Sequence, residues 1–219
     1  MDYQPRPALW SQKKQRDRLI ALAQQHPTWA VGYQDEVWFS RLAQPKLHSW
    51  SDGPGLRLHT KARDKGEQLA IACYGVLLAW SQEMLLRFVK GRPVSCVTVQ
   101  FLDWVTRTLA KRGTRVLVLV WDNARWHTSQ EVRQWVKAHN RKVKARTKRS
   151  QAKSTTAKAG CRLLLCPLPT RSPWLNNIEP KWVHGKRNIM EPQRKLEPLE
   201  LKQRLCSYYN CPLLSPLQQ

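Results

Sequence analysis

The sequence predicts an α/β fold in which helices cover both faces of a mixed β-sheet. Three observations predict it. Two neighbouring strand-like segments form a hairpin early in the chain, and strands then alternate with helices. Residues 116–121 are apolar throughout and rich in β-branched side chains, as expected of a central strand buried on both faces. With 219 residues, the chain has room for one full-sized domain.

The first half of the chain is expected to contain one helix and three strands. His26-Pro27 should end the helix, because proline disfavours a helical conformation in the residue before it. Ser81-Gln82 provides a tight turn for the hairpin, and residues 51–55 form a Gly- and Pro-punctuated loop. The expected elements are a basic amphipathic helix at 9–25, a strand at 31–39 and hairpin strands at 69–80 and 83–89.

The second half is expected to alternate helix and strand. Gly113 should end the first of its helices, and Thr128 with Glu131 forms the capping-box pattern that opens the next. The expected elements are a helix at 97–111, a strand at 116–121, a helix from 128, a strand at 163–166 and a helix at 177–189.

These elements suggest three regions. Residues 1–26 form a basic helix or tail, residues 27–190 the main folded domain, and residues 191–219 an irregular, proline-rich tail. A basic insertion interrupts the main domain at about residues 140–160. It carries eight Lys or Arg residues and no acid, which is typical of a solvated or disordered segment.

The charge of the chain predicts a polyanionic partner. It has 38 basic and 15 acidic residues, a net charge of +23, which favours nucleic acid over a membrane. The longest mostly apolar run, residues 69–80, is too short to span a bilayer, and the N-terminus has no signal-peptide core. We therefore expect a cytoplasmic protein with no membrane partner.

The six cysteines are not expected to bind zinc. The sequence has no Cys-x-x-Cys pair, and Cys161 and Cys166 flank a predicted strand at an offset that points them to opposite faces. Free thiols are expected instead.

Three acidic residues occur in ordered, apolar contexts. Asp35 lies in the middle of the predicted strand at 31–39, on the face expected to point into the core, whereas Glu36 points away from that face. Asp122 ends the central strand, and Glu179 opens the last helix. Each also has a simpler reading: an Asp bonded to a nearby turn, a strand-ending Asp-Asn pair, and an acid stabilised by a helix dipole. Together they indicate a site for two divalent cations, a common device for cutting phosphodiesters.

The segments around these acids carry a resemblance to a known family. They read Tyr-Gln-Asp-Glu-Val-Trp-Phe at 33–39, Val-Trp-Asp-Asn-Ala-Arg-Trp-His at 120–127, and Ser-Pro-Trp-Leu-Asn-Asn-Ile-Glu-Pro-Lys-Trp at 172–182. They resemble the three catalytic blocks of DDE transposases, in particular the bacterial insertion-sequence family related to mariner elements. The resemblance implies an RNase H-like catalytic domain over residues 27–190, with Asp35, Asp122 and Glu179 as its catalytic, metal-binding triad.

The resemblance also implies an activity. DNA would be cleaved and its strands transferred to move an insertion sequence, with two Mg²⁺ ions for which Mn²⁺ substitutes. Alternatives are an RNase H-like nuclease acting on structured or hybrid nucleic acid, and a catalytically silent remnant that only binds DNA. The expected partners are transposon ends and target DNA, a second copy of the chain, and an upstream helix-turn-helix product. The location would be the bacterial cytoplasm, at the nucleoid.

This sequence departs from the family pattern in two ways. The spacing from Asp122 to Glu179 is longer than usual, and we attribute the excess to the insertion at 140–160. The residues before Asp35 are too few for the family's DNA-binding modules, so we expect a catalytic half.

Further residues are expected to support the triad or to contact DNA. His127 either forms a hydrogen bond near the scissile phosphate or packs at a helix start, and Asn123 and Asn177 orient neighbouring groups or cap. The expected DNA contacts are Lys142, Lys144, Arg146, Lys148, Arg149, Lys181, Lys186 and Arg187. Core positions rather than base-stacking roles are expected for Trp38, Trp121, Trp126, Trp174 and Trp182.

Overall fold

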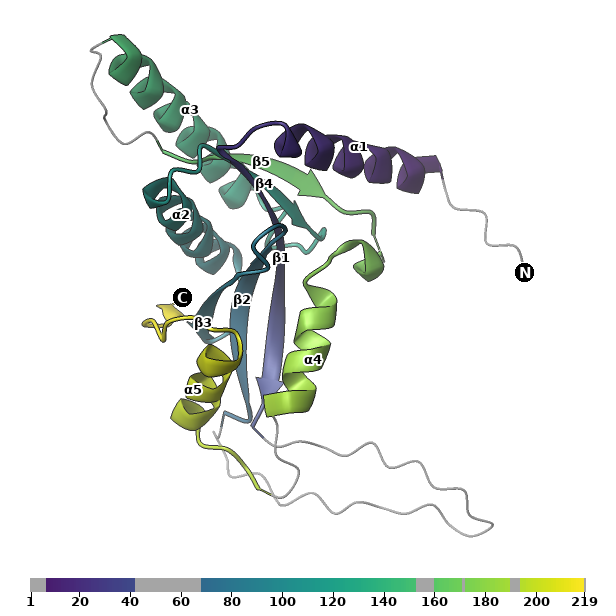
Figure 1. Cartoon of the computed structure of the whole chain (residues 1–219). Helices are drawn as coiled ribbons and strands as arrows, with labels where there is room; N and C mark the ends of the chain where they lie inside the picture. The colour runs from purple at the N-terminus through teal and green to yellow at the C-terminus, as the bar shows by residue number, and fades with distance from the viewer. Residues whose placement is uncertain (1–6, 42–67, 153–159, 171, 190–193, 219) are drawn as a thin grey trace.

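Six strands form one sheet with helices on both sides (Figure 1). The computed structural model describes residues 7–41, 68–152, 160–170, 172–189 and 194–218. The loop expected at 51–55 lies outside the described residues. The strands are β1 (Trp29–Ser40), β2 (Ala70–Leu78), β3 (Met84–Lys90), β4 (Val116–Trp121), β5 (Arg162–Pro167) and β6 (Leu217–Gln218). The helices are α1 (Pro7–Gln24), α2 (Ser95–Lys111), α3 (Gln130–Ala152), the short 3-10 helix η1 (Pro173–Leu175), α4 (Glu179–Ile189) and α5 (Pro198–Tyr208).

The sheet is mixed, as expected, with the strand order β5-β4-β1-β2-β3-β6. The hairpin β2–β3 is antiparallel, and β2 also pairs antiparallel with β1. On the other side of β1, strands β4 and β5 run parallel to it. β1 is therefore where the antiparallel and parallel halves of the sheet meet.

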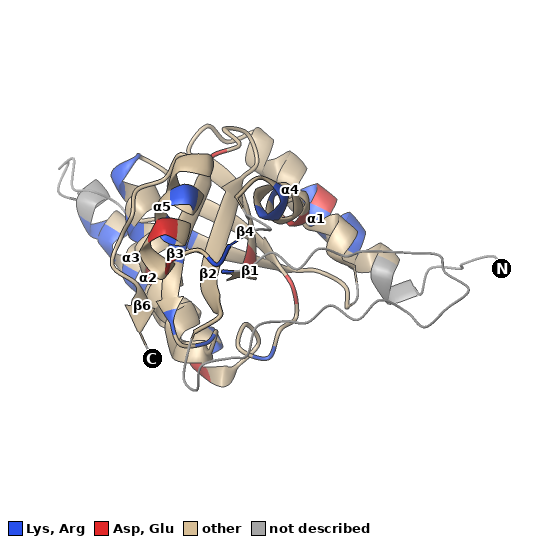
Figure 2. Cartoon of the chain, turned by 90° about the horizontal axis from the view of Figure 1, so that it is seen from below, with Lys and Arg blue, Asp and Glu red and all other residues tan. Residues whose placement is uncertain are grey.

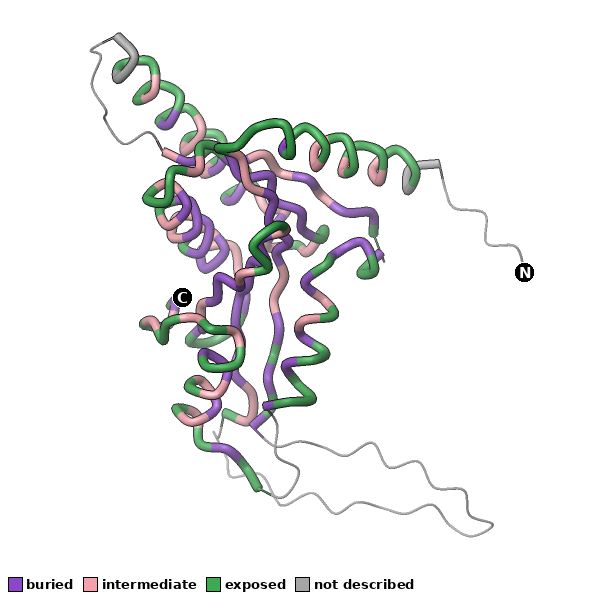
Figure 3. The backbone as a smooth tube through the Cα atoms, in the orientation of Figure 1, coloured by how far each residue is buried: buried purple, intermediate pink, exposed green. Residues whose placement is uncertain are grey.

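Each face of the sheet has its own apolar core. Side chains of α1, α4 and α5 pack on one face together with Val31, Val37 and Phe39 of β1. Side chains of α2 and α3 pack on the other face. The strands and α2 are largely buried, whereas much of α1 and the far end of α3 are exposed (Figure 3). Cys161 and Cys166 belong to opposite cores, as expected from their spacing, and all cysteines in the described ranges are free.

Of the two alternatives expected for residues 140–160, solvated or disordered, disorder is wrong over the first part, because α3 continues without a break to Ala152. Lys and Arg are good helix formers, so a basic run can extend a helix when its charges face solvent. Val143 is buried, and the Asn140 side chain both donates to Leu163 O and accepts from Leu163 N of β5. These contacts hold the start of the basic run against the sheet edge.

The expected irregular tail is also wrong, because it contains α5 and β6. Pro198 lies in the first turn of α5, where the missing N–H of proline costs nothing. Leu201 and Leu205, four positions apart, are buried on one face of this helix. Tyr209, just after α5, donates its hydroxyl to Lys181 O and thereby ties the C-terminal segment to α4.

In the part of the chain that the structure describes, none of the helices is long and apolar enough to cross a membrane.

Candidate active site

Each of the three acids lies at the position expected from the sequence. Asp35 is in the second half of β1, and Asp122 directly follows β4. The parallel register pairs Tyr33 with Val120, so each acid lies two residues beyond this pair on neighbouring strands. Glu179 is the first residue of α4, which packs over the same end of β1. The fold therefore brings together residues separated by more than half of the described chain.

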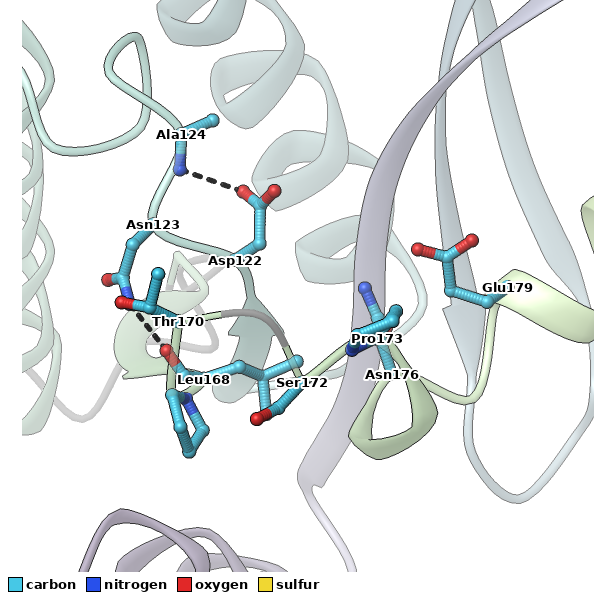
Figure 4. Close-up of a pocket in the computed structure, with 10 residues that line it drawn as sticks. Asp122, Asn123, Ala124, Leu168, Thr170, Ser172, Pro173, Asn176 and Glu179 are labelled. Carbon is cyan, nitrogen blue, oxygen red and sulfur yellow. Dashed lines mark hydrogen bonds between the residues drawn. The ribbon is translucent and has the colours of Figure 1, made fainter. Parts of the chain in front are cut away.

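Asp122 and Glu179 line a single cleft of about 300 Å³ (Figure 4). β1 passes between these two side chains in that view. The other lining residues come from the turn after β4 and from the loop that leads through η1 to α4. They are Asn123, Ala124, Leu168, Pro169, Thr170, Ser172, Pro173 and Asn176.

Asp35 lies deeper than the other two acids and does not line this cleft. Its carboxylate Oδ2 accepts a hydrogen bond from the indole Nε1–H of Trp182 at 3.0 Å. The residue opposite Asp35 on β2 is Gly75, and a Cβ there would lie 2.4 Å from the Trp182 ring. The absence of a side chain at Gly75 therefore allows the indole to reach Asp35.

Asp122 is held through one of its two oxygens. Oδ1 accepts the backbone N–H of Ala124 at 3.0 Å and the Nδ1–H of His127 at 2.7 Å. Among the described residues no donor reaches Oδ2, and none reaches the carboxylate of Glu179. Both acids thus present unpaired oxygens to a cleft.

His127 links Asp122 to Glu36. Its Nε2–H donates to Glu36 Oε1 at 2.7 Å, and its ring stacks on Trp121 with a centroid distance of 4.6 Å. The His127 side chain is fully buried. It is packed near a helix start, the second of the two roles considered from the sequence, and has no free ring nitrogen for a phosphate.

Burial and neighbouring charged groups shift the pKa values of the three acids. Burial, followed by the charges of Glu36 and Glu179, raises the pKa of Asp35 from 3.8 to about 8. Burial and the charge of Asp122 raise the pKa of Glu179. Burial also acts to raise the pKa of Asp122, but the hydrogen bonds from His127 and Ala124 outweigh it and lower the pKa. The acids are therefore close enough to repel one another, and a cation would relieve that repulsion.

Burial and the neighbouring carboxylates act on the pKa of His127 in opposite directions. Burial alone would lower it, but the charge of Glu36 and the hydrogen bonds to both carboxylates raise the pKa to about 9. The imidazole is therefore held as a cation between two carboxylates at neutral pH.

Comparison with known proteins assigns the chain to a family. The sequence profile of the family described as DDE superfamily endonuclease matches residues 30–200, more than half of the chain. This chain belongs to the DDE superfamily of endonucleases. No curated protein sequence matches it.

Solved structures with a similar fold are those of the Mos1 mariner transposase. The Mos1 paired-end complex with the left transposon end aligns at a TM-score of 0.60 and 16% identity, covering 97% of this chain and 58% of that chain. The Mos1 catalytic domain aligns at 0.58 and 13% identity, covering 97% and 86%. The Mos1 paired-end complex with Mg aligns at 0.58 and 16% identity, covering 95% and 56%. This likeness confirms the expected RNase H-like fold, and the chain spans a little over half of the Mos1 chain in the paired-end complexes.

The donor chemistry of this site suits a hard divalent cation. Mg²⁺ and Mn²⁺ prefer carboxylate oxygens, and Asp122 and Glu179 offer such oxygens without competing donors. As the side chains stand, no three His, Cys, Asp or Glu residues of the described ranges converge on one point.

The asparagines of the second and third motifs have different environments. Asn177 is exposed, whereas its neighbour Asn176 is buried, lines the cleft and donates its Nδ2–H to Gln34 O of β1. The sequence carries adjacent asparagines, and only the η1 turn determines which of them faces inward. Asn123 donates its side-chain amide to Leu168 O and so joins the two loops that border the cleft.

The expectation that the five tryptophans are core residues is wrong for two of them. Trp38 is 45% exposed and Trp174 is 63% exposed, whereas Trp121 and Trp182 are buried. Trp38 lies near the end of β1, and Trp174 lies in η1, whose buried residue is Leu175.

The basic residues expected to contact DNA lie on two helices. On α4, Lys186 and Arg187 are exposed and Lys181 is partly buried. The charge of Lys186 acts to lower the pKa of Glu179, which places this lysine near the cleft. On α3, all five of the expected residues are exposed: Lys142, Lys144, Arg146, Lys148 and Arg149.

Proposed function

We propose that this chain is the catalytic part of a transposase that cleaves DNA and transfers the freed strand, moving an insertion sequence. The observation that carries the proposal is that Asp35, Asp122 and Glu179 lie close enough together for the charge of one acid to raise the pKa of another. Asp122 and Glu179 line one cleft, and the charges of both act to raise the pKa of Asp35. Membership of the DDE endonucleases supplies the reaction class, phosphodiester cleavage.

The proposed cofactor is a pair of Mg²⁺ ions, for which Mn²⁺ substitutes. Two such ions activate the attacking oxygen and stabilise the leaving oxygen of the phosphodiester. Asp122 and Glu179 would hold them through their unpaired oxygens. Asp35 has a raised pKa and keeps its proton in the metal-free protein. It would become a third ligand after losing that proton when the cation binds. The Mos1 paired-end complex with Mg supports this choice of ion.

The proposed substrate is DNA, both transposon ends and target. The net charge of +23 supports a polyanionic substrate. Figure 2 shows Lys and Arg along α3 and on α4, and α4 begins with Glu179. A DNA backbone bound along α4 would thus pass the cleft. The likeness to a Mos1 complex with a transposon end supports the same substrate.

The proposed assembly is a homodimer that bridges two transposon ends, with a helix-turn-helix product supplying end recognition at the bacterial nucleoid. The resemblance to the mariner-related insertion sequences supports this assembly. Size-exclusion chromatography with light scattering, with and without end DNA, measures whether the chain pairs.

The test of the proposed function is nicking of supercoiled plasmid in Mg²⁺ or Mn²⁺. We expect nicking by the intact protein, its loss in EDTA, and its loss in Asp122→Ala and Glu179→Gln. Glu131→Gln, at an exposed acid in the first turn of α3, is the matched control and should nick normally.

Other outcomes would contradict the proposal in distinct ways. Cleavage of an RNA–DNA hybrid without any strand transfer into plasmid would favour an RNase H-like nuclease. Tight, salt-sensitive DNA binding with no nicking by any variant would favour a remnant that only binds DNA.

A further inference from the structure

Glu36 follows Asp35 in β1, but its side chain lies on the opposite face of the sheet, away from the Trp182 side. It is almost completely buried, with 7% of its side chain exposed. From there it reaches Asp122 through His127, by hydrogen bonds of 2.7 Å on each side of the imidazole. We propose that Glu36 is a positioning residue that fixes the orientation of the Asp122 carboxylate for cation binding. This inference rests on the proposed function.

Glu36 holds the imidazole at Nε2, and Asp122 is bonded to its other nitrogen, Nδ1. Glu36 Oε1 accepts from His127 Nε2–H and also from Gln34 Nε2–H at 2.8 Å. Stacking on Trp121 and an edge contact with Trp126 fix the plane of the ring. A ring fixed in its plane and bound at Nε2 can aim Nδ1–H in only one direction, toward Asp122.

The consequence for Asp122 is an asymmetric carboxylate. Its Oδ1 receives two hydrogen bonds, from His127 and from the Ala124 backbone, so it is saturated. Oδ2 has no donor among the described residues and is left for a ligand in the cleft. Groups behind a metal ligand commonly fix its orientation in this way, and their loss typically weakens metal binding about 10- to 100-fold.

Packing alone does not account for a glutamate at position 36. Its neighbour across the strand pair is Tyr74, which is fully buried in the core formed with α2 and α3. An apolar side chain at position 36 would extend that core without the cost of burying a carboxylate. The glutamate is therefore better explained by its bond to His127 than by the fold of β1.

Two substitutions separate positioning from stability. Glu36→Leu keeps the volume but removes the acceptor, leaving Nε2–H unpaired. Glu36→Gln restores a carbonyl oxygen, and because both donors use the same oxygen of Glu36, one carbonyl can accept both. The amide of Gln can also donate to an unprotonated Nε2, so it holds the ring in either protonation state.

The first measurement is Mn²⁺ binding without DNA, by electron paramagnetic resonance of the free ion. The second is the Mg²⁺ concentration that half-saturates plasmid nicking. For Glu36→Leu we expect the dissociation constant for Mn²⁺ and the half-saturating Mg²⁺ concentration each to rise about tenfold or more. The affinity for DNA in EDTA should stay unchanged. Glu36→Gln should lie closer to the wild type than to the Leu variant, and Glu131→Gln should match the wild type.

Thermal melting shows which variants are folded, and only those are compared. A folded Leu variant with wild-type Mn²⁺ affinity overturns the inference, as does a Gln variant as impaired as Leu. If the Leu variant does not fold, Gln is compared with Glu36→Met, which also lacks an acceptor. A wild-type protein that binds no Mn²⁺ and nicks no plasmid overturns the proposed function itself, a result distinct from equal binding by all variants.

Discussion

The indole Nε1–H of Trp182 donates to the Asp35 carboxylate, and this bond joins α4 to β1. Trp182 lies one turn after Glu179 in α4, so a single helix carries one acid and orients another. The ring is buried between Phe39 of β1 and Tyr209 beyond α5. The C-terminal segment therefore contributes to the geometry of the acids.

Trp182→Phe should uncouple α4 from Asp35. We expect a loss of about 2 kcal/mol in the free energy of unfolding, from the missing hydrogen bond and the smaller ring. In a double-mutant cycle with Asp35→Leu, urea unfolding should give an interaction energy of about 1 kcal/mol. Strict additivity of the two substitutions would mean that the bond contributes nothing.

Gly75→Ala should displace the same indole. The new Cβ would lie 2.4 and 2.6 Å from two Trp182 ring atoms, closer than packed atoms allow. We expect destabilisation by about 1–3 kcal/mol and weaker Mn²⁺ binding.

Gly113→Ala is the control for that substitution. Gly113 has a φ of +90° and open space around its Cβ position, so alanine there strains the backbone away from the site. It should lower stability without changing Mn²⁺ affinity. Equal Mn²⁺ affinity in both variants would argue against a role for the Trp182 position.

Asp35→Asn should change the pH dependence of stability in metal-free protein. The folded carboxyl has a pKa of about 8, raised from 3.8 chiefly by burial and then by neighbouring acids. Between these values only the folded state holds the proton. The stability that Asp35 contributes is therefore complete below about pH 4 and is lost as pH rises to about 8.

The measurement is urea unfolding of wild type and variant in EDTA at about pH 5 and about pH 8.5. Asparagine does not titrate, so the variant should gain stability relative to the wild type at the higher pH. A difference independent of pH would contradict the raised pKa.

The basic face of α3 is expected to set part of the salt dependence of DNA binding. Deleting the segment would remove buried Val143, so charge substitutions are the better test. Lys144→Gln with Lys148→Gln should reduce the slope of log K against log salt by about 0.9 per lost phosphate contact. Lys90→Gln with Lys111→Gln, at exposed lysines on other elements, is the matched control. Equal slopes for the two pairs would exclude α3 as a phosphate contact.

Local pattern was sufficient for much of the fold. The expected strand at 116–121 agrees with β4 at both ends, because a continuously apolar, β-branched run has few alternatives to a buried strand. The alternation in β1 likewise predicted that Asp35 shares a face with Val37 and Phe39. The sequence pattern predicts irregular structure at α5 because of its prolines, but Pro198 lies in the first turn of a helix.

The prediction that Asp35, Asp122 and Glu179 form the site came from local sequence, because carboxylates in or after apolar strands and at a helix start are recognisable from their immediate neighbours. The environment of these acids depends on how the elements pack in three dimensions. The bond of Trp182 to Asp35 and the link of Glu36 through His127 to Asp122 join residues up to 147 positions apart. Local pattern specifies which face of an element a side chain occupies. Its partner across the core depends on how separate elements pack, and that information is spread over the whole chain.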